Sequence, residues 1–163
     1  MIIGVPKEIK NNEYRVAVTP IGVREFVKHG HEVIIEKNAG IESNIPDSDY
    51  EKEGAGIVSR DEVFSRAEML YKVKEILPEE YKYMREGLIV FTYIHSNAHR
   101  EETDVLLKNK IIGVSYEDIE DKDGNFPLLS PMSKIAGRGG FIAACEYAQK
   151  IKGGRGLLLA NVP

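Results

Sequence analysis

The chain has 163 residues, of which 42% are hydrophobic and 29% are charged, and its formal net charge is −4. These values are typical of a globular protein with one good hydrophobic core, and they argue against a disordered chain. Lysines and arginines are dispersed among the acidic residues instead of forming a basic stripe. Nucleic acid and anionic membranes are therefore not expected partners.

The beginning of the chain lacks the charged region, apolar core and cleavage site of a signal peptide. No apolar run approaches the roughly 18 residues that are needed to span a bilayer. The single cysteine, Cys145, lies in an alanine-rich helical stretch that favours a buried core thiol over a nucleophile. We therefore expect no membrane association and a location in the reducing cytoplasm.

The first predicted elements are a strand, a loop and a helix. The apolar run Ile2–Pro6 predicts a buried strand that ends in a loop at the proline. After a polar segment, Thr19 and Pro20 are typical of a helix N-cap and first helical position. They predict a helix over residues 21–29, which Gly30 ends.

Strands and helices then alternate along the chain. Alternating, β-branched or aromatic residues predict strands over residues 31–36, 69–74, 88–94 and 111–116. Helices are predicted over residues 50–53, 60–66, 101–110 and 133–150, with another that begins at Pro78. This alternation predicts an α/β fold, with a mostly parallel sheet flanked by helices in a Rossmann-like arrangement.

The last segment resembles the start of a second domain. A glycine-rich turn at residues 153–156 precedes an apolar run that predicts a strand, and the sequence stops soon after. The alternative is that this strand completes the first sheet. We expect an α/β domain over residues 1–130, a long connecting helix over 131–152, and the truncated beginning of another domain over 153–163.

Three charged or titratable residues follow predicted strands. Arg15 lies in the loop after the first strand, while Lys74 and His95 close the strands that precede them. Ligands of open α/β sheets bind beyond the carboxyl ends of the strands, so these residues should gather at one edge. Arginine offers a fork for a carboxylate, lysine a point charge for a carbonyl oxygen, and histidine a proton carrier. Together they fit a small keto or amino acid, although each alone is more often structural.

Other constellations are weaker. The four histidines show no HxxxH or HExxH spacing, so no metal site is expected. The glycines at 137, 139 and 140 lack the spacing of a phosphate loop, and their helical context predicts close helix packing. Ser133 lies near the start of the long helix, where it either caps the helix or meets an anion or ribose.

Many segments of the sequence occur in family order in alanine dehydrogenases. The matching segments are residues 3–13, 15–17, 19–20, 30–33, 72–75, 85–87, 91–95, 116–117, 127–129, 131–133 and 136–138. The chain therefore resembles the N-terminal, substrate-binding domain of the alanine dehydrogenase and nicotinamide nucleotide transhydrogenase family over essentially its whole length. Transhydrogenases are the second choice, since they do not keep the counterparts of Lys74 and His95. Saccharopine dehydrogenases share the architecture but match the local motifs less well.

The resemblance implies the oxidation of L-alanine by NAD and water to pyruvate, ammonia and NADH. Under it, Arg15 and Lys74 bind pyruvate or alanine, and His95 is the proton donor and acceptor. A carboxylate from the NAD-binding domain, which would begin near residue 153, completes the site. The resemblance also implies a homo-oligomer, a hexamer in the family, whose first domain is completed by carboxy-terminal helices.

Three further residues acquire roles from the resemblance. Leu129 and Met132 would line the pocket for the substrate methyl group, with plain core packing as the alternative, and Ser133 would touch NAD. The sequence departs from the family pattern at Lys134, at residues 139–141 and in residues 160–163, and these departures bear on the cofactor contacts. Alone, this chain would bind a keto acid weakly, would hold NAD poorly and would be inactive. The alternatives are a standalone module that binds small carboxylates and a structural remnant.

Overall fold

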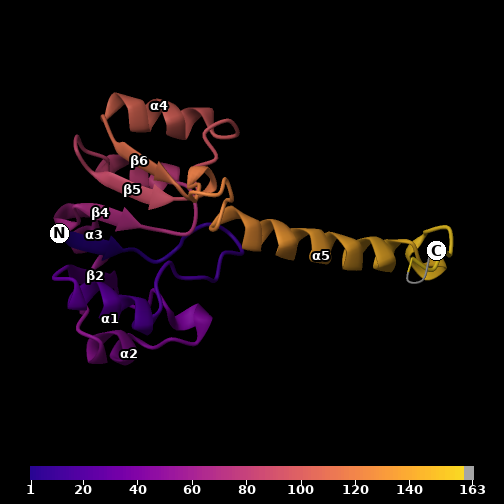
Figure 1. The fold of residues 1–163 in the computed structure, drawn as a ribbon, viewed down its shortest axis with the longest axis horizontal. Coiled ribbons are helices and arrows are strands. Elements are labelled where there is room, and N and C mark those ends of the chain that lie inside the picture. Colours follow the sequence, from indigo (N-terminus) through magenta and orange to yellow (C-terminus); the bar gives the residue numbers. More distant parts are fainter. Residues whose placement is uncertain (160–163) are drawn as a thin grey trace. The chain divides into compact units, whose positions relative to one another are not determined.

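The computed structural model describes residues 1–159. These residues form two compact units (Figure 1). The first unit is Met1–Glu117, and the second begins at Asp118. The first unit holds a β-sheet with its helices, and the second holds one long helix.

The unit Met1–Glu117 is built on a parallel sheet. Its strands are β1 (Ile2–Val5), β2 (Glu32–Glu36), β3 (Gly56–Val58), β4 (Met69–Tyr71), β5 (Ile89–Thr92) and β6 (Ile112–Ser115). They lie in the order β3-β2-β1-β4-β5-β6, and every pairing is parallel. The predicted α/β class with a parallel sheet is confirmed. The strand β3 has no counterpart among the predicted strands.

Helices connect the strands. The α-helices of this unit are α1 (Pro20–Lys28), α2 (Asp47–Lys52), α3 (Arg60–Arg66) and α4 (Arg100–Lys108). Short 3-10 helices are η1 (Ile41–Ser43), η2 (Pro78–Tyr83) and η3 (Tyr116–Asp118). The Thr19 side chain accepts a hydrogen bond from the Gly22 N–H, as predicted for the N-cap of α1. The helix predicted at Pro78 is confirmed as a 3-10 helix.

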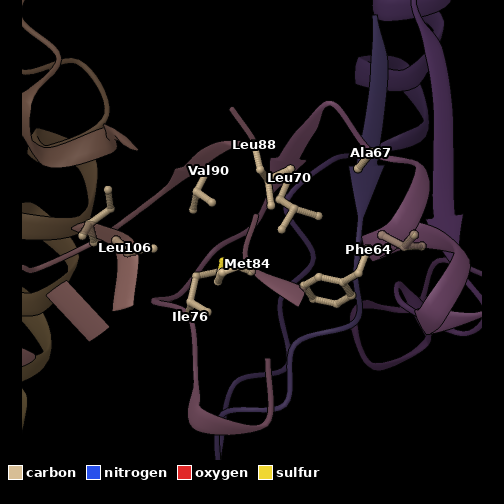
Figure 2. Packing of buried hydrophobic residues seen from close by; sticks show 10 residues of the cluster. Phe64, Ala67, Leu70, Ile76, Met84, Leu88, Val90 and Leu106 are labelled. Atoms are coloured by element: carbon tan, nitrogen blue, oxygen red, sulfur yellow. The ribbon is translucent and has the colours of Figure 1, made fainter. Parts of the chain in front are cut away.

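Two hydrophobic clusters stabilise this unit. In one cluster, shown in Figure 2, Phe64 of α3 and Leu106 of α4 pack with Leu70 and Val90 of the central strands. In the other, side chains of α1 and α2 pack with alternate residues of β2. Within β4, Leu70 belongs to the first cluster and the next residue, Tyr71, packs against the second. Because successive residues of a strand point to opposite faces, helices cover both faces of the sheet.

Helix α3 approaches the sheet very closely at Gly4. A Cβ atom at this position would lie 2.6 Å from the Cβ of Ala67 and 3.0 Å from Cγ1 of Val63. The close contact between α3 and β1 therefore depends on the missing side chain of Gly4.

The second unit contains the long helix α5 (Leu129–Tyr147) and the 3-10 helix η4 (Lys150–Lys152). The helix begins four residues before the predicted start at Ser133, and none of its residues is buried. A Cβ at Gly137, Gly139 or Gly140 would meet no atom within 4 Å, so the predicted close packing is not found among the described residues. Cys145, expected in a core, is only partly buried.

The predicted strand after the glycine-rich turn is wrong for the residues that can be described. Residues 155–159 have no regular secondary structure, and residues 160–163 lie outside the described part of the chain. The compact units divide at residues 117 and 118, whereas the expected domain boundaries at 130 and 152 stay predictions. Within residues 1–159, no helix is both long and apolar enough to cross a membrane.

Candidate functional site

The loops that carry Arg15, Lys74 and His95 leave the same edge of the sheet. They follow β1, β4 and β5, which are neighbours in the sheet and run parallel to one another. Lys74 and His95 do not close their strands as predicted, because β4 ends at Tyr71 and β5 at Thr92. Each instead lies three residues beyond its strand, in irregular backbone.

The guanidinium of Arg15 is held by a carboxylate two residues earlier. Arg15 Nε donates to Glu13 Oε1 at 2.7 Å, and its terminal nitrogen Nη2 donates to Oε2 at 2.6 Å. The Arg15 backbone N–H donates to the same carboxylate at 3.0 Å. These bonds hold the pKa of Glu13 below its ordinary value, and the positive charge of Lys74 lowers it further. An anionic ligand that takes the fork of Arg15 must compete with Glu13.

The backbone around Lys74 is fixed by side chains from other segments. The Val73 N–H donates to Glu8 Oε1 at 2.7 Å, and the Lys74 N–H donates to the same oxygen at 3.3 Å. The Thr92 hydroxyl donates to the Lys74 carbonyl at 2.8 Å. Burial raises the pKa of Glu8, although the nearby Lys72 charge and these backbone donors oppose the increase. The backbone from which the Lys74 side chain extends is therefore held by hydrogen bonds to Glu8 and Thr92.

A buried ion-pair network lies beneath this segment. Lys72 is fully buried, and its ammonium lies 2.8 Å from Glu80 Oε1 and 3.4 Å from Glu8 Oε2. The same Glu80 oxygen accepts from Arg60 at 2.6 Å. The Tyr116 hydroxyl donates to the Lys72 carbonyl at 2.7 Å. The network surrounds the buried charge of Lys72 with partners, as burial of an ion requires.

His95 has an unusual backbone conformation. Its φ is +53°, in the left-handed region that few residues other than glycine adopt, although asparagine, aspartate and histidine are enriched there. Its N–H donates to Glu117 Oε1 at 2.6 Å, and its carbonyl accepts from the Ala98 N–H at 2.8 Å. The imidazole stacks on the Tyr93 ring with centroids 5.8 Å apart, and Nδ1 lies 3.6 Å from Glu117 Oε1. The ring remains partly open to solvent.

The other three predicted site residues belong to the second unit. Leu129 is the first residue of α5, with Leu128 as its N-cap, so Ser133 is the fifth residue of the helix and does not cap it. Leu129 and Met132 are half-buried, and Ser133 is exposed. Their participation in a site with the first unit stays a prediction.

Sequence reasoning missed the carboxylates that hold these loops, which are Glu8, Glu13 and Glu117. The only sequence signal was the spacing of two residues between Glu13 and Arg15. A cavity of about 340 Å³ lies elsewhere, between η2 and the start of α4, and is lined by Glu75, Tyr81, His99 and Glu102 among others. It includes none of the predicted site residues. Among the described residues, no group of three or more histidine, cysteine, aspartate or glutamate side chains could hold a metal ion.

Comparisons with known proteins identify relatives of this chain. The family model described as alanine dehydrogenase/PNT, N-terminal domain, matches residues 4–136. The chain is 49% identical over 163 residues to an alanine dehydrogenase of Staphylococcus saprophyticus and 51% identical over 164 residues to one of Methanococcus maripaludis. Both alignments cover 100% of this chain and 44% of the relative. The chain thus spans less than half the length of these relatives.

Solved structures give the same result. A structure titled L-alanine dehydrogenase aligns with a TM-score of 0.86 at 46% identity, over 100% of this chain and 45% of that one. A transhydrogenase from Sinorhizobium meliloti aligns with a TM-score of 0.68 at 27% identity, over 72% of this chain and 34% of that one. The similarity to the alanine dehydrogenase is therefore both greater and more complete.

Proposed function

Because this chain belongs to the family described as alanine dehydrogenase/PNT, N-terminal domain, we propose that it forms the substrate-binding part of an L-alanine dehydrogenase. The whole enzyme would convert L-alanine, NAD⁺ and water to pyruvate, ammonia and NADH. One observation supports this proposal above the others. The loops after three adjacent parallel strands carry Arg15, Lys74 and His95, at the edge where α/β sheets bind ligands.

The chemistry of these three side chains suits pyruvate and L-alanine. Arg15 would bind the substrate carboxylate in place of Glu13, whose two oxygens now occupy the same kind of bidentate contact. Lys74 would place its ammonium against the carbonyl oxygen and stabilise the negative charge that develops there. His95 would exchange the proton. Since one carboxylate must replace another on Arg15, we expect pyruvate to bind weakly.

The 163-residue sequence lacks the glycine-rich fingerprint of an NAD site. It contains no GxGxxG pattern, and Ser133, proposed to touch the cofactor, is an exposed residue within a helix. NAD is therefore proposed only as the co-reactant of the whole enzyme, and no step is assigned to it. A methyl pocket at Leu129 and Met132, a homo-oligomer and a cytoplasmic location belong to the same proposal.

Titration of pyruvate into the purified 163-residue chain tests the substrate site. The ring resonances of His95, assigned with a His95→Gln variant, should move as pyruvate is added. They should not move in Arg15→Ala. In Arg15→Lys they should move only slightly, because lysine lacks the two-pronged guanidinium that pairs with a carboxylate. Arg24→Ala is the matched control, since Arg24 is an exposed arginine of α1 that pairs with Glu53. An equal response in Arg15→Ala and the unaltered chain would contradict the proposal.

A further inference from the structure

The backbone conformation of His95 requires an explanation. A left-handed residue that carries a side chain costs roughly 1–2 kcal/mol, and such residues persist where their surroundings impose them, often at functional sites. Glycine avoids this cost, whereas the chain has a histidine here with φ of +53°, and its side chain bears part of the cost even though histidine is one of the residues enriched in this region. The surroundings must therefore supply contacts that hold this conformation.

Glu117 supplies the most direct of these contacts. It follows β6, the neighbour of β5, and its Oε1 accepts the His95 N–H at 2.6 Å. The carboxylate is mostly covered, with 17% of its side chain exposed. Burial works to raise the pKa of Glu117, but the hydrogen bond from the His95 N–H and other donors outweigh it, so the pKa lies below its ordinary value. Glu117 is thus ionised at neutral pH.

The same oxygen also faces the imidazole ring. Oε1 lies 3.6 Å from Nδ1, a distance for charge attraction and not for a hydrogen bond. Stacking on Tyr93, with an interplanar angle of 8°, restricts the ring on one face. With Nδ1 directed at the carboxylate, Nε2 is the nitrogen that remains for a ligand.

We propose that Glu117 is a positioning residue for His95. It holds the left-handed backbone through the N–H, and it favours the tautomer with the proton on Nδ1, so that Nε2 exchanges the proton with the substrate. When Nε2 accepts that proton, the positive charge on the ring lies beside the Glu117 carboxylate. This role rests on the proposed function, in which His95 is the proton carrier.

The ring nitrogens of His95 provide a test that needs no ligand. In the unaltered chain, the ¹⁵N shifts of the neutral ring should show mainly the Nδ1–H tautomer. Glu117→Gln keeps an acceptor oxygen but removes the charge, and we expect the ratio of Nδ1–H to Nε2–H to fall by roughly tenfold, because the attraction between the Nδ1–H and the carboxylate charge is lost. Asp118→Asn instead removes the exposed charge of the next residue, and it should leave the ratio unchanged.

A second measurement covers the case in which Glu117→Gln fails to fold. In the unaltered chain, a scalar coupling across the hydrogen bond should join the His95 amide nitrogen to the Glu117 carboxyl carbon. Absence of this coupling, or an unchanged tautomer ratio in a folded Glu117→Gln, would overturn the positioning role alone. Failure of pyruvate to move the His95 resonances in the unaltered chain would instead overturn the proposed function.

Discussion

Replacement of Glu80 by glutamine should show how far the site depends on its buried ion pairs. Glu80 and Lys72 are both fully buried and lie 2.8 Å apart. In Glu80→Gln the Lys72 ammonium would keep one carboxylate, Glu8, at the longer distance of 3.4 Å. Removal of one partner from a buried pair costs about 3–5 kcal/mol, because the other charge stays buried with too little compensation. For a unit of this size, the melting temperature should fall by about 10 °C or more.

Urea denaturation followed by circular dichroism measures this cost. Glu86→Gln is the control, since Glu86 pairs with Lys110 at 3.0 Å with both side chains about 70% exposed, and it should change stability by at most about 0.5 kcal/mol. A Lys72→Met change in the Glu80→Gln background removes the uncompensated charge and should recover part of the loss. If Glu80→Gln unfolds at the same urea concentration as the unaltered chain, or if the double variant recovers nothing, the reasoning is refuted.

Three more predictions concern other contacts of the same unit. Burial raises the pKa of Glu102 to about 7 from an ordinary 4.5, so its contribution to stability is complete below pH 4.5 and is lost as pH rises through about 7. Between urea titrations at pH 5 and pH 8, the free energy of unfolding of the unaltered chain should therefore fall relative to that of Glu102→Gln. Gly4→Ala should cost about 1–3 kcal/mol in the same assay because its Cβ would lie 2.6 Å from Ala67, whereas Gly56→Ala, with 3.7 Å to its nearest neighbour, should cost clearly less. Thr92→Val leaves the Lys74 carbonyl without its hydroxyl donor, and hydrogen exchange of the amides at 72–76 should accelerate, while exchange in α1 should not.

The fold was predictable because most of its strands carry a strong local pattern. Residues 31–36 alternate, and residues 88–94 are β-branched and aromatic, so β2 and β5 were found. The strand β3 has three residues at the edge of the sheet, too few to produce a period. Strand β4 was predicted three residues too long, because Val73 and Lys74 donate their N–H groups to Glu8 instead of to a neighbouring strand.

The candidate site was predictable only in part. That Arg15, Lys74 and His95 follow strands was visible in the sequence, and the parallel strand order places their loops at one edge. Of the carboxylates that hold these loops, Glu8 and Glu117 were not visible. Glu8 is 65 residues from Val73, and Glu117 is 22 residues from His95, so no local pattern joins them. Such pairs arise only when the sheet has brought its loops together.

The repeated use of carboxylates at this edge has one physical origin. Where parallel strands end, backbone N–H groups lose their strand partners, and a buried N–H without an acceptor is costly. Glu8 and Glu117 each accept such an N–H, from residues 73 and 95 respectively. The same negative charges lie near the cations at this edge and oppose an anionic ligand. Affinity for a small carboxylate should therefore depend on the bidentate geometry of Arg15 more than on net positive charge. For this reason Arg15→Lys should lose that affinity, whereas a site that depends on charge alone would keep it.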